Sequence, residues 1–240
     1  MKINSLCGLK LFALSLVFSS CMTLNKTDIN VMTRDLDKMS IEEKLENCSW
    51  ILSQYPDSDP IRENRAVIYY KLGLFSYSLD DCGYLIDKGY ESDEITAIFG
   101  SLNGKNIDID EEKWLSVYDC YKKGYSNYFK GLFYAQIEER EIALNEFISA
   151  DKSLHHGFLK MNACELAGDI YAENLLYDNA IIYYRKADKI YSKDLNLHFK
   201  MFEVFLKQND LVSAKEELKV IKELSGDELL YQNAIKKLEY

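Results

Sequence analysis

Two features are scarce in this chain, and each scarcity excludes a class of protein. Only two prolines, Pro56 and Pro60, occur in 240 residues. With long periodic apolar segments beside it, this scarcity favours helices over a strand-and-turn fold. Positive charge is also in short supply, since the formal net charge is −10. We therefore expect no nucleic-acid partner and no binding of anionic lipid by charge alone, because both need a basic face.

The short motifs of several enzyme classes are missing too. The sequence contains no HExxH, no GxSxG, no glycine-rich phosphate loop and no CxxC pair. These gaps remove support for zinc, redox and common hydrolytic or nucleotide chemistry. His155 and His156 are adjacent and so do not share a helix face, and His198 stands alone. We predict a protein that is not an enzyme and uses no cofactor.

Acidic residues gather at two places, and neither pattern predicts a metal or catalytic site. Four glutamates lie between positions 138 and 146. We interpret them as the turn and the solvated outer face of a helix pair, since catalytic carboxylates must converge in a pocket. The run DIDEE at 108–112 has its glycine, Gly104, before the acids. An EF-hand loop needs that glycine among them, so we predict a loop and an acidic helix N-cap.

The N-terminus has the pattern of an export signal. Two lysines and an apolar run over 11–18 precede Ser19-Ser20-Cys21, and the run is shorter than the ~20 residues that a spanning helix needs. The cysteine after two small residues resembles the lipobox of bacterial lipoproteins. That resemblance implies a cleaved signal at 1–20, acylation of Cys21 and anchoring to a bacterial membrane, inner or outer. The alternative is an ordinary secretory signal followed by an incidental Cys21.

The most informative pattern is a repeat. Five small or bulky apolar positions recur at offsets 0, 3, 12, 16 and 19, in copies that begin at Ala66, Gly131, Gly168 and Phe202. Spacings of three and four place residues on one helix face, and the nine-residue gap holds a turn. Each copy is therefore predicted to be two antiparallel helices. Small residues at offsets 0 and 12 allow close approach, and the residue at offset 16 is expected to reach the neighbouring unit.

The pattern resembles the tetratricopeptide repeat, most closely at 164–187 and 130–151. The resemblance covers about residues 40–221 and implies an all-α fold, a right-handed α-solenoid of antiparallel helix pairs. The expected organisation is a signal peptide at 1–20, a tether or weak first helix at 21–39, helical repeats at 40–224 and a capping helix at 225–240. An irregular, Sel1-like unit at 92–123 is expected to contain a short helix at 93–102 and a second helix at 111–124.

Four cysteines remain once the signal is removed. An even count in an exported protein permits disulfides. Cys48 and Cys82, however, take the same repeat position, and equivalent positions on stacked units lie ~8–10 Å apart or more. A disulfide needs Cα atoms within ~7 Å. We favour buried free thiols for most of the set, which also includes Cys120 and Cys164.

The resemblance also implies a partner-binding groove lined by the first helices of the repeats. Carried over residue by residue, the groove positions are Glu63, Tyr70, Lys71, Tyr125, Tyr128, Gln136, Asn162, Glu165, Asp169, Glu173, Glu203 and Lys207. Tyrosines beside acids would suit a partner with apolar anchors and basic residues. Each single position is also compatible with an ordinary solvated helix surface.

The leading functional hypothesis is a lipid-anchored scaffold that binds other proteins or peptide segments of the bacterial cell envelope. A narrower version resembles the lipoprotein of the outer-membrane barrel assembly machinery, on the strength of SQYPDS at 53–58. An exported enzyme with a site not visible in the sequence, and a host-facing surface lipoprotein, are the alternatives.

Overall fold

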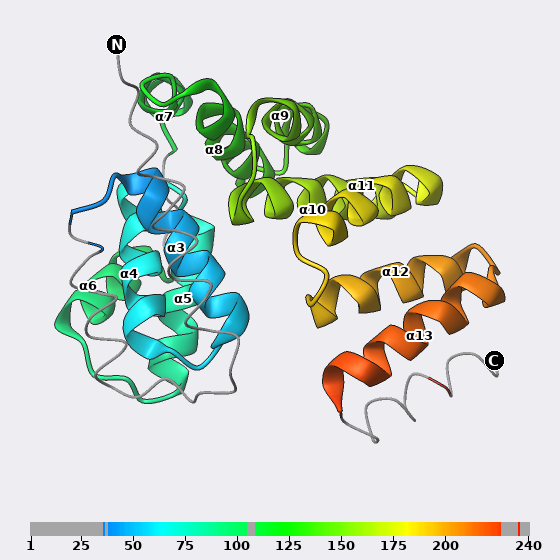
Figure 1. The fold of residues 1–240 in the computed structure, drawn as a ribbon. Coiled ribbons are helices and arrows are strands. Elements are labelled where there is room, and N and C mark those ends of the chain that lie inside the picture. Colours follow the sequence, from blue (N-terminus) through cyan, green and yellow to red (C-terminus); the bar gives the residue numbers. More distant parts are fainter. Residues whose placement is uncertain (1–35, 37, 105–108, 227–234, 236–240) are drawn as a thin grey trace, which may run out of the picture. The chain divides into compact units, whose positions relative to one another are not determined.

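A computed structural model describes residues 36, 38–104, 109–226 and 235. Contacts divide the chain into two compact units, Met1–Met39 and Ser40–Tyr240. All regular secondary structure in the described part of the second unit is helical (Figure 1). Its helices are α3 (Ile41–Gln54), α4 (Asp59–Lys71), α5 (Phe75–Asp87), α6 (Asp93–Leu102), α7 (Glu111–Tyr118), α8 (Lys123–Gln136), α9 (Arg140–Ser153), α10 (Phe158–Glu173), α11 (Tyr177–Ile190), α12 (Leu195–Lys207) and α13 (Leu211–Ser225).

Several predictions about the chain ends fall outside the described residues. The signal peptide, Cys21 and nearly all of the tether belong to them, as does most of the predicted capping helix. Ile235, the one described residue between 227 and 240, is partly buried against the core of α10 to α13. No helix within the described ranges is both long and apolar enough to cross a membrane.

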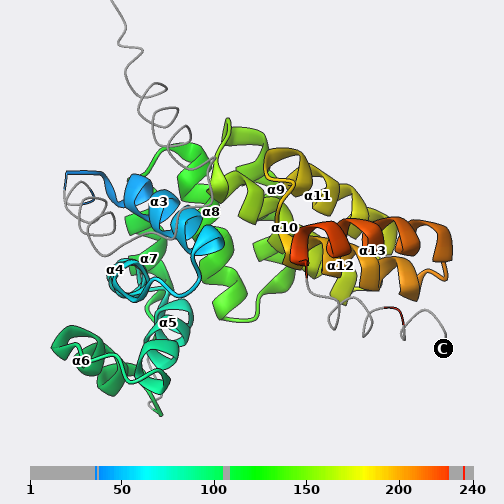
Figure 2. The same cartoon turned by 60° about the horizontal axis from the view of Figure 1, so that its bottom comes forward.

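Helix pairs are the building block of the second unit, as predicted. Four pairs of helices pack as hairpins: α4 with α5, α8 with α9, α10 with α11, and α12 with α13. Successive hairpins are joined where α9 packs on α10 and where α11 packs on α12. The two views show the last two hairpins side by side (Figures 1 and 2). The predicted all-α array of antiparallel helix pairs is therefore confirmed.

The repeat positions form the contacts inside each hairpin. A Cβ placed on Gly131 would lie 2.5 Å from Phe147 Cε1, and one placed on Gly168 would lie 2.5 Å from Tyr184 Cδ1. The bare glycine backbone therefore makes room for an aromatic ring of the second helix. The residue at offset 16 packs within its own hairpin in both copies, and Tyr184 also belongs to a core cluster that includes Met201 and Phe202 of the next hairpin.

The turns inside the four hairpins share one backbone geometry. A residue with positive φ stands at offset 7 of every copy: Gly73, Glu138, Leu175 and Asn209. The next residue donates its N–H to the carbonyl at offset 3, as in the 2.9 Å bonds from Leu74 to Tyr69 O and from Leu176 to Tyr171 O. This is the six-to-one bond of a Schellman motif, which satisfies helix-end carbonyls that would otherwise lack a donor.

The irregular unit differs in part from its prediction. Helix α6 occupies the predicted span, with Ser92 capping its start through a bond from Ile95 N. The second helix was predicted to run to residue 124, but α7 ends at Tyr118 and α8 begins at Lys123. Tyr118 explains the break, because its buried side chain packs against α8 and its hydroxyl donates to Leu72 O at 2.7 Å.

Helix α3 contacts an element far along the chain. It begins at Ser40 with a capping box completed by Glu43 and packs on both α4 and α10. The Glu46 carboxylate accepts the backbone N–H groups of Phe158 and Leu159 at the start of α10. A simple solenoid has contacts between neighbouring repeats alone, so this contact is a departure from the predicted linear stack.

Candidate functional site

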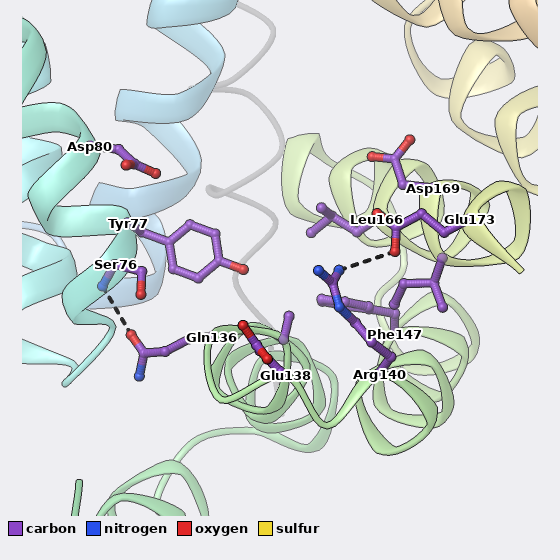
Figure 3. A pocket seen from close by; sticks show the side chains of 12 residues that line it. Ser76, Tyr77, Asp80, Gln136, Glu138, Arg140, Phe147, Leu166, Asp169 and Glu173 are labelled. Carbon is purple, nitrogen blue, oxygen red and sulfur yellow. Dashed lines mark hydrogen bonds and ion pairs between the residues drawn. The ribbon is translucent and has the colours of Figure 1, made fainter. Parts of the chain in front are cut away.

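A cleft of about 310 Å³ lies where α5 faces the ends of α8 and α10. Figure 3 shows the side chains around it: Tyr77 and Asp80 from α5, Gln136 at the end of α8, Glu138 in the α8–α9 turn, and residues of α9 and α10. Gln136 joins the two sides, since its oxygen accepts from Ser76 N at 3.1 Å and its nitrogen donates to Gly73 O at 3.1 Å.

The charged side chains that line the cleft are mostly acidic. Four carboxylates, Asp80, Glu138, Asp169 and Glu173, face one guanidinium, Arg140. Arg140 lies 3.4 Å from Glu173, and both side chains are about half exposed. Within the described residues, neither Asp80 nor Glu138 has a basic partner. Partial burial and the neighbouring carboxylate Asp81 raise the pKa of Asp80, so this group would gain from a nearby positive charge.

Apolar surface lies between these charges. Leu166 and Tyr77 are half-buried and line the cleft, and the Tyr77 ring points into it (Figure 3). Phe147 and Ile170 also border the cleft but are buried. The Tyr77 ring is held against Tyr69, with 5.5 Å between the ring centroids. Burial raises the pKa of Tyr77, so its phenol stays neutral. A ring with a polar tip beside carboxylates can contact an apolar side chain and a donor together.

The structure brings three of the sequence-predicted groove residues together in this cleft: Gln136, Asp169 and Glu173. Asp169 is already engaged. It accepts the Tyr184 hydroxyl at 2.8 Å and lies 2.7 Å from Lys200 Nζ. Lys200 also reaches Glu165, which is buried, at 2.7 Å. Burial raises the pKa of Glu165, with Lys200 opposing that rise.

Tyr128 and Asn162 lie in the interior contacts between hairpins. Tyr128 is 1% exposed, and its hydroxyl donates to Asn162 Oδ1 at 2.7 Å. Burial raises its pKa, and Tyr69, Tyr77 and Glu46 are among the groups that act on it. The N-terminal helices therefore cover this part of the expected groove, and Tyr128 has no surface to offer a partner.

The remaining predicted positions divide into internal contacts and positions that are exposed or half-buried. Glu63 accepts hydrogen bonds from Tyr90 and Ser92 and so ties α4 to the start of α6. Tyr70 packs edge-on against Phe75. Lys71, Glu203 and Lys207 are exposed, and Tyr125 is half-buried. Partner binding by these exposed residues stays a prediction.

Tyr77, Asp80 and Arg140 were missed by the sequence reasoning. Tyr77 and Asp80 lie on α5, the second helix of its hairpin, whereas the expected groove used first helices alone. The cleft forms because α5 faces α8 and α10, and no periodic signal in the sequence specifies that approach. The described residues contain no group of His, Cys, Asp and Glu side chains that could hold a metal ion. The four cysteines 48, 82, 120 and 164 are free, and Cys120 is the exposed one among them.

The chain matches no protein-family model and no curated protein. Similar solved structures include the Cut9–Hcn1 hetero-tetramer of the APC/C, with 16% identity, a TM-score of 0.47, and coverage of 83% of this chain and 39% of that one. YrrB, a TPR protein described as having an unusual peptide-binding site, has 12% identity and a TM-score of 0.42 over 81% and 88% of the two chains. MamA has 15% identity and a TM-score of 0.38 over 91% and 100%.

Proposed function

We propose that the chain is a non-enzymatic scaffold whose cleft binds a peptide segment that carries basic and apolar side chains. The observation that supports this is the cleft itself, which combines excess carboxylates with the half-buried side chains of Tyr77 and Leu166. Asp80 and Glu138 lack a basic partner, and a lysine or arginine of the peptide that enters between them would supply it. An adjacent apolar side chain would pack on Leu166 and the Tyr77 ring.

The finer proposal places this scaffold on a bacterial membrane. A signal at 1–20 and acylation of Cys21 would tether the repeats to the cell envelope, where they would bind envelope proteins. The support is the order of the lysines, the apolar run and Ser19-Ser20-Cys21 in the sequence. Metabolic labelling with a palmitate analogue should label the wild type and not Cys21→Ser; equal labelling of both would remove the anchor.

Charge reversal in the cleft tests the binding proposal. The variant Asp80→Lys with Glu173→Lys should recover less of a stoichiometric membrane protein partner than the wild type in an affinity pull-down with mass spectrometry. Because both substitutions place positive charge where we expect a basic segment, we expect a loss of about tenfold or more.

A matched control variant makes the same change in net charge at two positions outside the cleft. Asp87 on α5 and Glu223 on α13 are exposed and lie outside the cleft. The variant Asp87→Lys with Glu223→Lys should retain the partner. Equal loss in both variants would show that net charge and not the cleft governs binding.

The two alternative functions predict different experimental results. A component like the barrel-assembly lipoprotein should recover outer-membrane barrel assembly proteins specifically. Turnover of a small molecule by the purified protein would support the exported enzyme.

A further inference from the structure

The turn between α10 and α11 carries an unusual residue for its backbone. Leu175 has φ +61° at the position where the equivalent turns hold Gly73, Glu138 and Asn209. Glycine and asparagine are the usual residues there, because a side chain with a Cβ is strained in the left-handed region. Leu175 is nevertheless 69% exposed. Its backbone therefore costs stability, and its exposed side chain returns little of that cost by burial.

The apolar surface around Leu175 continues onto the next hairpin. Leu176 is 51% exposed, and Val212 at the start of α13 is 72% exposed. The two turns are neighbours, since Gln208 Nε2 in the α12–α13 turn donates to Asp178 Oδ1 on α11 at 2.6 Å. Figure 1 shows them at the same end of their hairpins, and Figure 2 agrees. We call Leu175, Leu176, Leu211 and Val212 the turn edge.

The charges beside the turn edge are mostly negative. Glu173 and Asp178 flank the first turn, and Asp210 flanks the second. Hydrogen bonds from Ser213 lower the pKa of Asp210, so it stays ionised. Two basic residues lie close by: Lys207 on the last turn of α12, and Arg140, which lies 3.4 Å from Glu173. An acidic rim disfavours an anionic lipid surface and favours a partner with basic side chains.

We propose that the turn edge is a second docking surface, separate from the cleft, for a protein partner that presents an amphipathic helix with leucine-like side chains flanked by basic residues. Leu175 and Leu176 would enter the apolar face of that helix, and Asp178 and Asp210 would face its basic residues. A strained, exposed leucine is then retained for contact, because strain at an exposed position commonly marks function.

Two designed peptides test this on the full chain in an Asp80→Lys background, which weakens the cleft. One is an amphipathic helical peptide of leucine and lysine, and the other replaces each lysine by glutamate. We expect fluorescence anisotropy to show binding of the leucine–lysine peptide only. Leu175→Asn with Val212→Ser should weaken it by about tenfold or more, since two apolar contacts are lost.

The Leu175→Asn substitution installs the residue that the next repeat carries at the same place. Because asparagine tolerates the left-handed region better, it should raise Tm by ~2 °C or more while binding falls. Weaker binding by Leu175→Asn alone, together with a higher Tm, would therefore not be a loss of folding. The control Ile182→Asn removes another exposed apolar side chain, five residues into α11, and should bind as the parent does.

Several results would overturn the proposal. These are unchanged affinity in the turn-edge variant, equal binding of the glutamate peptide, or equal weakening in Ile182→Asn. Sedimentation of the protein with phosphatidylcholine vesicles that depends on Leu175 would assign the turn edge to a lipid surface instead. Self-association that depends on Leu175 would assign it to a second copy of this chain.

Discussion

Two glycines determine how closely the helices of a pair approach. Gly131 and Gly168 leave no room for a Cβ, because an aromatic ring of the second helix occupies that space. Gly131→Ala should therefore lower the free energy of unfolding, since overpacking costs ~1–3 kcal/mol and the gain in helix propensity returns at most ~1 kcal/mol. Urea denaturation of the purified chain measures the difference, and Phe147→Leu should recover part of it.

Gly100 is expected to respond to substitution by alanine in the opposite direction. It lies inside α6, and nothing surrounds the position that a Cβ would take. Gly100→Ala should raise the free energy of unfolding by ~0.5–1 kcal/mol, because alanine restricts the unfolded chain and favours the helix. The same sign of effect at both positions would contradict the packing argument.

His198 should make stability depend on pH. Burial alone would lower the pKa of His198, but Glu217, the Ser192 carbonyl and Asp188 outweigh it and raise the pKa above its ordinary value. Nδ1 lies 2.8 Å from Glu217 Oε2. A raised folded pKa means that the stabilisation is complete below the unfolded pKa of about 6.5 and is lost as pH rises through the folded value.

The matching measurement compares the wild type with His198→Gln. The free energy of unfolding of the wild type relative to this variant should fall from about pH 6 into the mildly alkaline range. Taking the difference cancels the groups that titrate in both proteins. A difference that stays constant with pH would mean that folding leaves the pKa of His198 unchanged, and a difference that rises with pH would mean that His198 is kept neutral in the folded chain.

At the scale of the elements, a side chain of α3 caps the start of α10. Gly157, which precedes α10, has no side chain to cap it, and Glu46 accepts two of its first N–H groups instead. Glu46→Ala should cost ~1–3 kcal/mol, because buried N–H groups lose their acceptor. Glu46→Gln keeps one acceptor oxygen and should cost less. Hydrogen exchange at the Phe158 and Leu159 amides should accelerate in the alanine variant. Unchanged exchange would contradict the capping role of Glu46.

The elements also show what the sequence can and cannot predict. Positions such as Ala143, Phe147 and Ala180 are buried as predicted, because spacings of three and four determine which face of a helix is covered. The extent of α6 was predicted because capping and turn residues are local signals. The early end of α7 was missed because it depends on Tyr118 reaching Leu72, a contact across 46 positions.

The candidate site was predicted less completely than the fold. Gln136, Asp169 and Glu173 were found because they occupy family groove positions on first helices. Tyr128 and Glu165 occupy such positions too, yet the return of α3 and contacts with Lys200 bury them. Tyr77 and Asp80 enter the cleft from α5. A linear stack of repeats contains no contact that would bring them there, so repeat periodicity could not identify them.

For the molecule as a whole, the two proposed surfaces make different demands on a partner. The cleft combines carboxylates with a tyrosine ring and would hold a segment inside it. The turn edge projects apolar side chains outward and would enter a partner's own apolar face. Separate variants at Asp80 and Leu175 should therefore affect binding independently, since effects at distant sites usually add. A titration of each variant and of their combination measures whether the losses add.

The central claim is that the cleft selects basic and apolar peptide segments. Selection of a random peptide library on the purified wild-type chain, repeated on the Asp80→Lys, Glu173→Lys variant and on the Asp87→Lys, Glu223→Lys control, tests it most directly. We expect the wild type and the control to enrich the same sequences, rich in lysine or arginine beside leucine or phenylalanine, and the cleft variant to lose them. Enrichment of acidic sequences, or the same enrichment on all three proteins, would contradict the claim.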